Sequence, residues 1–125
     1  MALNTLKKRT EFLRVKGGLR WSTPFLVVET VLRPDTEGDD GAPRIGFTVS
    51  KKIGNAVVRN RVRRRLRAAV STLNPTRLRS SHDYVVIART GAAECAYQEL
   101  VADLEQAFQR VHQRGRRGRG SQKSR

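Results

Sequence analysis

The segment from residue 51 to residue 67 combines dense positive charge with the apolar spacing of a helix. It contains eight lysines and arginines and no acidic residue. Apolar side chains recur through it and just beyond it at steps of three and four, at Val58, Val62, Leu66, Ala69 and Leu73. This period predicts an amphipathic helix that packs one face on a hydrophobic core and turns most of its arginines away from that core.

Signals for both ends of this helix lie beside it in the sequence. Gly54 permits a tight turn from a strand into the helix, and Asn55 suits the N-cap position, so the helix is expected to begin near Asn55 or Ala56. The Asn74-Pro75 pair is expected to break it. The free backbone N–H groups of the first turn would add donors for an anion.

The arginines of this segment repel one another, and no acidic residue stands three or four positions away to offset them. Polyanionic phosphate relieves that repulsion, and the planar guanidinium offers it two parallel donors. The whole chain carries a formal net charge of +15, with further basic clusters in residues 7–20 and 110–125. The sequence therefore predicts nucleic-acid binding, although nonspecific attraction to any polyanion would account for the composition alone.

The rest of the chain shows strand signals and helix signals in turn. We expect a short helix at 6–16, strands at 24–32, 45–50 and 83–89, and a long amphipathic helix at 97–111. The acidic stretch from Asp35 to Asp40 is typical of a solvated loop. Residues 114–125 contain no apolar side chain, so a single domain at 1–113 is expected to be followed by a disordered basic tail. A mixed sheet carrying a strand–helix–strand unit indicates an α+β fold.

The strand at 45–50 has two different faces. Ile45, Phe47 and Val49 alternate with Gly46, Thr48 and Ser50. Because successive side chains of a strand point to opposite faces, one face packs on the core and the other carries only small residues. That second face is either open to solvent or the floor of a groove.

Side chains suited to catalysis are scarce. His82 and His112 belong to no motif that links them to a nucleophile, and Cys95 lacks the spacing of a metal ligand. No carboxylate cluster is suited to two-metal chemistry, so we expect no catalytic and no metal-binding residue in the chain. A single cysteine fits a reducing cytoplasm, and no segment is typical of a secretion signal or a membrane span.

The run from Val49 to Arg64, together with Arg67, narrows the prediction. Its unbroken core, Gly-Asn-Ala-Val-x-Arg-Asn-Arg, resembles the signature of the bacterial ribonuclease P protein subunit. The residues from Leu6 to Phe12 before it and the Asp-Tyr-Val-Val-Ile-Ala-Arg stretch at 83–89 after it agree with that resemblance. The similarity extends over roughly residues 6–111 and does not include the basic tail.

The resemblance implies a fold and a function. The implied fold is a small two-layer α-β sandwich of ribosomal-protein type, with about four strands in a mixed sheet, three helices and a left-handed βαβ crossover. That handedness departs from the general rule. The implied partners are a catalytic RNA and precursor tRNA, with no membrane and no obligate protein partner. The complex removes the 5′ leader of precursor tRNA by hydrolysis. The RNA supplies the active site, and Mg²⁺ is held mainly by the RNA.

The resemblance also assigns roles to residues by position. The RNA-binding residues are expected to be Lys51, Lys52, Asn55, Arg59, Asn60, Arg61, Arg63, Arg64 and Arg67. The leader of precursor tRNA is expected to lie between the first helix and the sheet, in contact with Phe12, Lys51, Lys52 and Arg89. Three positions depart from the family pattern: Lys16 replaces an aromatic residue, Thr90 a basic one and Arg65 an apolar one. At the edge of the apolar stripe, Arg65 is expected to extend outward to solvent.

Two questions stay open at the level of sequence. Phe12 could stack on an unpaired base or pack in the core. The protein could also be a structural RNA-binding protein of ribosomal type with no role in cleavage, or a stand-alone nuclease or DNA-binding protein. The last pair is disfavoured by the missing carboxylates and by the absence of the paired short helices of a DNA-binding motif.

Overall fold

A computed structural model of the protein describes residues 4–6, 8–34 and 38–113. Five strands form one sheet: β1 (Asn4–Thr5), β2 (Leu19–Ser22), β3 (Leu26–Leu32), β4 (Arg44–Thr48) and β5 (His82–Ala88). The helices are α1 (Arg9–Val15), α2 (Ala56–Ser71) and α3 (Tyr97–Gln113), with single 3₁₀ turns η1 (Lys51–Ile53), η2 (Pro75–Arg77) and η3 (Thr90–Ala93). The predicted tail at 114–125 lies outside the described residues.

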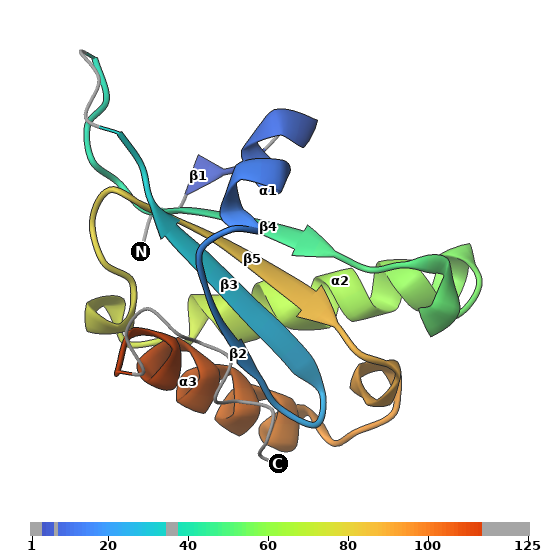
Figure 1. Ribbon diagram of the computed structural model, residues 1–125. Helices are drawn as coiled ribbons and strands as arrows, with labels where there is room; N and C mark the ends of the chain where they lie inside the picture. The colour runs from blue at the N-terminus through green and yellow to red at the C-terminus, as the bar shows by residue number, and fades with distance from the viewer. Residues whose placement is uncertain (1–3, 7, 35–37, 114–125) are drawn as a thin grey trace.

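The sheet is mixed, with the strand order β1-β4-β5-β3-β2. β4 runs parallel to both β1 and β5, whereas β3 is antiparallel to β5 and to β2. In Figure 1 the chain leaves β4 and passes behind the sheet through α2. It then returns to the sheet as β5, which lies between β4 and β3. This path makes the crossover left-handed, and the α+β fold expected from the sequence is confirmed.

The two faces of the sheet are covered unequally. α2 and α3 pack behind it in Figure 1 and enclose the main hydrophobic core, whose largest buried side chains include Tyr84, Phe108 and Leu26. α1 lies on the opposite face over a smaller cluster built on Leu6, Val15 and Val85. Because α1 has only seven residues, it covers part of that face and leaves the rest accessible.

The predicted start of α2 is confirmed in detail. Gly54 has φ = 153°, a backbone conformation that residues with a Cβ rarely adopt, and the Asn55 side chain accepts a hydrogen bond of 3.0 Å from the Val58 N–H. Val62, Leu66 and Ala69 of the predicted stripe are fully buried. The chain turns at Asn74, whose side chain accepts from the backbone N–H of the residue after Pro75.

The first predicted helix differs from expectation at its start. Leu6 does not belong to α1, because its N–H donates to the Ile45 carbonyl at 3.0 Å and continues the pairing of β1 with β4. α1 begins at Arg9, where the Lys8 N–H donates to the Glu11 carboxylate at 3.0 Å. β2 was also not predicted, since four residues give too short a pattern and the strand is defined by its pairing with β3.

A buried ionic cluster joins α1 to the sheet. The Asp83 carboxylate is fully buried and accepts hydrogen bonds from Arg14 of α1, Arg33 and Arg44, at 2.8–3.0 Å. Burial opposes ionisation of Asp83, but these hydrogen bonds prevail and hold its pKa below the ordinary value. The cluster therefore fixes the position of α1 on the sheet.

The predicted solvated loop is exposed at Asp39, and the carboxylate of this residue also has a partner in the protein. The Asp39 carboxylate accepts two hydrogen bonds, of 2.7 and 2.9 Å, from the buried Arg33 and so joins the ionic cluster. Arg33 is 6% exposed and needs a second carboxylate besides Asp83 to balance its desolvated charge. Asp35 and Glu37 lie outside the described residues.

Candidate nucleic-acid interface

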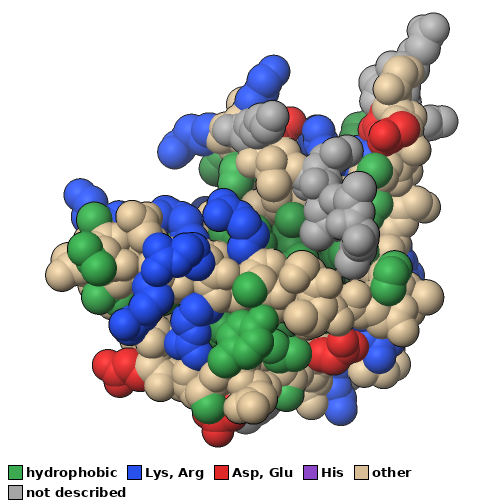
Figure 2. Space-filling view, turned by 180° about the vertical axis from the view of Figure 1, so that it is seen from behind, with side chains coloured by type: hydrophobic (Ala, Val, Ile, Leu, Met, Phe, Trp, Pro, Cys, Tyr) green, Lys and Arg blue, Asp and Glu red, His purple; other side chains and the backbone are tan. Residues whose placement is uncertain are grey.

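One side of the molecule is dominated by the arginines of α2. Figure 2 shows lysine and arginine side chains gathered on the side where α2 lies. The polar positions Asn60, Arg61, Arg64 and Arg67 are exposed, and Arg59 and Arg63 are half-buried. None of the ion pairs among the described residues involves an arginine of this helix. The positive charge of α2 is therefore available to an external anion.

The contacts of these arginines within the protein are with neutral groups. Arg59 Nε donates to the Gly54 carbonyl at 3.2 Å, and the Arg67 guanidinium lies 5.9 Å from the centre of the Phe47 ring. Such contacts orient the guanidinium without neutralising its charge. The helix thus presents an ordered row of cations, a geometry suited to a phosphate backbone.

Arg65 does not extend outward as expected. Its guanidinium turns toward η3 and donates to the carbonyls of Ala92 (3.0 Å), Ala93 (3.1 Å) and Cys95. These carbonyls lie at the end of η3 and just after it, where no helical N–H satisfies them, and a guanidinium can hold several of them at once. Arg61 also reaches the Ala93 carbonyl, at 3.2 Å. Arg65 is therefore a structural residue, and Arg64 is the cleaner probe of the exposed face.

A groove runs along the sheet face that α1 leaves uncovered. Its first part is a hollow of about 460 Å³ beneath α1. Its second part is a hollow of about 610 Å³ that extends to η1 and the end of β5. The two hollows share Arg20 and Ile87 and therefore adjoin. Together they have the size of a ligand site rather than of a packing defect.

The small-residue face predicted for the strand at 45–50 forms part of the floor of the groove. Thr48 lines the first hollow and Ser50 the second. Gly46 lies directly under Phe12, because a Cβ at this position would come within 2.5 Å of the Phe12 ring. The open question about this face is thus answered in favour of a groove.

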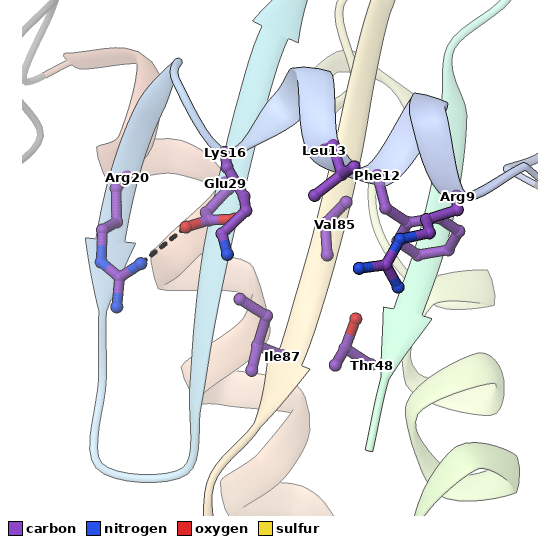
Figure 3. Close-up of a pocket in the computed structure, with 9 residues that line it drawn as sticks. All are labelled: Arg9, Phe12, Leu13, Lys16, Arg20, Glu29, Thr48, Val85 and Ile87. Atoms are coloured by element: carbon purple, nitrogen blue, oxygen red, sulfur yellow. Dashed lines mark hydrogen bonds and ion pairs between the residues drawn. The ribbon is translucent and has the colours of Figure 1, made fainter. Parts of the chain in front are cut away.

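Phe12 has both of the environments considered for it. It is half-buried and packs against the smaller cluster, and it also lines the first hollow beside Leu13 (Figure 3). One edge of the ring is therefore held by the protein while another borders the groove. This arrangement fits an aromatic platform that is fixed before it meets a base.

The cations of the groove were predicted only in part. Of the cations expected to contact the leader, Lys52 and Arg89 line the second hollow, whereas Lys51 is exposed and is not among the residues that line either hollow. Arg9, Lys16 and Arg20 line the first hollow and were not predicted. Arg9, Phe12, Leu13 and Lys16 follow the spacing i, i+3, i+4, i+7, which places them on one helix face and could have identified them.

One acidic residue lies among these cations. Glu29 of β3 is 4% exposed and lines the first hollow, and its Oε2 accepts from Arg20 Nη1 at 2.6 Å. Burial raises its pKa, while the Arg20 guanidinium opposes that rise. In the sequence Glu29 is only an interruption of an apolar stretch, so nothing there indicated its place in the groove.

The two histidines meet at the end of α3. His82 and His112 have ring centroids 5.2 Å apart, and a hydrogen bond of 2.7 Å joins the Tyr84 hydroxyl and His112 Nε2. Burial, together with the charges of Arg79 and His82, lowers the pKa of His112 to about 4. Neither histidine lines the groove.

The pKa of His112 predicts an acid-sensitive stability. The folded-state pKa of about 4 lies below the ordinary value of 6.5, so the unfolded chain binds the proton more readily. This contribution is complete above pH 6.5 and is lost as the pH falls toward 4. From pH 7.5 to pH 5 this loss should lower the free energy of unfolding by at most about 2 kcal/mol, because solvent beside the half-buried His112 screens part of the effect. Urea titrations at both pH values should show a smaller loss for His112→Gln, and equal losses for the two proteins would contradict the assignment.

Comparison with known proteins gives a consistent result. The family model described as Ribonuclease P matches residues 2–112. A ribonuclease P protein component of Paramagnetospirillum magneticum is 46% identical over 110 residues, which are 87% of this chain and 83% of the relative. One of Gluconacetobacter diazotrophicus is 43% identical over 111 residues, 88% and 92% of the two chains.

A solved structure agrees with these relatives. The RNase P protein of Staphylococcus aureus, determined at 2.0 Å, superposes with a TM-score of 0.71 at 29% sequence identity, and the match covers 89% of this chain and 97% of that one.

Proposed function

Because the chain belongs to the ribonuclease P protein family, we propose that it is the protein subunit of a ribonuclease P holoenzyme. In this role it binds a catalytic RNA and the 5′ leader of precursor tRNA, and it promotes endonucleolytic removal of the leader. The observation that best supports this role is that two surfaces occur on one small domain: the arginine face of α2, which forms no ion pair with a described residue, and a cation-lined groove with an aromatic wall.

We assign a different RNA partner to each of the two surfaces. The arginine face of α2 has the regular spacing of cations that suits a phosphate backbone, so we assign it to the catalytic RNA. The groove combines Phe12 with the cations Arg9, Lys52 and Arg89. Single-stranded RNA needs both kinds of group, because its bases stack and its backbone is charged. We therefore assign the groove to the unpaired leader.

The hydrolysis itself is assigned to the RNA subunit, with Mg²⁺ held mainly there. Within residues 4–6, 8–34 and 38–113, no group of three or more His, Cys, Asp and Glu side chains could hold a metal ion. Glu29 and Asp83, the buried carboxylates of the described chain, are both paired with arginine. The role proposed for the protein is thus to bind and orient RNA.

A reconstitution tests this function. Precursor tRNA and Mg²⁺ are incubated with the protein alone, with the catalytic RNA alone and with both, and the 5′ end of the product is mapped. We expect cleavage at the mature 5′ end to be stimulated only when both are present. Cleavage by the protein alone would indicate a nuclease. Binding to the RNA without any stimulation would indicate a structural RNA-binding protein.

Removal of Arg64 should weaken binding to the catalytic RNA without harming the fold. Its side chain is exposed and has no partner among the described residues. We expect Arg64→Ala to lower the magnitude of the slope of log K against log[salt] by about 0.7–0.9, the value for one lost phosphate contact. Arg79→Ala removes the same charge outside α2 and both hollows and serves as the control. Identical slopes for the two variants would refute the assignment of this face.

A further inference from the structure

Arg20 occupies the point where the two parts of the groove meet. It is the only cation among the described residues that lines both hollows. Its side chain is half-exposed, and its partner Glu29 stands directly opposite it on the neighbouring strand. Any single strand that runs through both hollows must therefore pass this side chain.

The Arg20 guanidinium is hydrogen-bonded to Glu29 through one nitrogen only, and its other donors have no partner among the described residues. Figure 3 shows the Glu29 carboxylate pointing toward Arg20 along the face of the sheet. Only Nη1 is engaged, at 2.6 Å from Glu29 Oε2, and no other described residue accepts a hydrogen bond from Arg20. The Nε–Nη2 edge is thus left as a planar pair of donors, the arrangement that matches two oxygens of a phosphate.

Separation of the Arg20 guanidinium from Glu29 would cost free energy. The Glu29 side chain is only 5% exposed, and withdrawal of the guanidinium would leave a buried carboxylate with no partner. An RNA bound in the groove is therefore expected to meet Arg20 in the position seen here. A long side chain that is already fixed loses less conformational entropy on binding than a free one.

From this geometry we propose that Arg20 binds a phosphodiester of single-stranded RNA at the junction of the two hollows, and that Glu29 is its positioning residue. This inference rests on the proposed role of the groove in leader binding. It makes the acidic residue favourable for binding a polyanion, because Glu29 acts by orienting Arg20. If Glu29 acted only through its negative charge, it would instead weaken the binding of a polyanion.

A positioning role and a pure charge effect predict opposite changes in precursor binding, so substitution of Glu29 distinguishes them directly. Affinities of the holoenzyme for precursor and mature tRNA are measured under conditions that prevent cleavage. Glu29→Gln removes a negative charge from the groove, so an effect of charge alone would tighten precursor binding. We expect precursor binding to weaken by about threefold instead, with mature tRNA unchanged. Tighter or unchanged precursor binding would overturn the positioning role.

Matched variants separate this result from other causes. Glu105→Gln breaks the Arg77–Glu105 pair, which has the same distance of 2.6 Å but lies away from both hollows, and it should leave both affinities unchanged. Arg20→Ala should weaken precursor binding by about tenfold and Arg20→Lys by less, because lysine keeps the charge but not the planar fork. In the Arg20→Ala background, Glu29→Gln should no longer weaken binding.

Arg20→Ala leaves the buried Glu29 carboxylate without its partner, whereas Arg20→Lys keeps a cation beside it, so Arg20→Lys carries the test if Glu29→Gln or Arg20→Ala fails to fold. Suppose that the wild-type holoenzyme binds precursor tRNA more tightly than mature tRNA and that Arg20→Ala keeps the same preference. This inference would then be refuted, and the proposed function would stand. A wild-type holoenzyme that does not distinguish the two RNAs would refute the leader-binding role itself.

Discussion

Asp83→Asn is expected to cost about 3–5 kcal/mol of the free energy of unfolding, the range for breaking a buried ion pair from one side. The substitution keeps the shape of the side chain but leaves Arg33, whose side chain is 4% exposed, facing a neutral amide. Arg14 and Arg44 lose their shared partner as well. The loss should appear as a lower urea midpoint with an unchanged slope.

Glu105→Gln is the control for this measurement. Its pair with Arg77 is partly exposed on both sides and should contribute less than about 1 kcal/mol. Similar losses for the two variants would show that the Asp83 cluster is no more important than a surface ion pair. Because Arg14 belongs to α1, folded Asp83→Asn protein should also lose part of its preference for precursor tRNA, as the wall of the groove is no longer fixed.

Phe12→Ala should reduce the affinity of the holoenzyme for precursor tRNA far more than its affinity for mature tRNA. Stacking of one base on an aromatic side chain contributes about 1–3 kcal/mol, which corresponds to a roughly 5- to 150-fold loss. Mature tRNA has no leader and cannot lose this contact. Both affinities are measured with the holoenzyme assembled from folded variant protein.

The packing role of Phe12 requires its own control. Val31 packs in the same small cluster but lines neither hollow, so Val31→Ala should lower stability without changing the ratio of the two affinities. If Phe12→Ala weakens precursor and mature tRNA equally, the ring serves only to support α1 and the stacking role is excluded.

The features that the sequence predicted correctly are those that local patterns determine. The start of α2 follows from the backbone freedom of Gly54 and the capping oxygen of Asn55, both within one turn of the helix. The two faces of β4 follow from strict alternation. The position of the groove beneath the first helix came from the family resemblance and not from any pattern in the residues.

The features that the sequence did not predict depend on distant partners. Asp83 meets Arg14, Arg33 and Arg44 across 39 to 69 residues of chain, and no local pattern marks such a meeting. Arg65 was expected in solvent because a helix pattern alone cannot show that unsatisfied carbonyls of η3 lie beside it. Glu29 meets Arg20 through the pairing of β2 with β3, which the sequence did not predict.

The most direct test of the account is the dependence of precursor affinity on leader length. Precursor tRNAs with leaders of increasing length are bound to the catalytic RNA alone and to the holoenzyme. With the protein present, affinity should rise with each added nucleotide until the groove is filled, and then stay constant. With the RNA alone the affinity should vary little with length. Parallel dependence in the presence and absence of the protein would contradict the claim that this groove binds the leader.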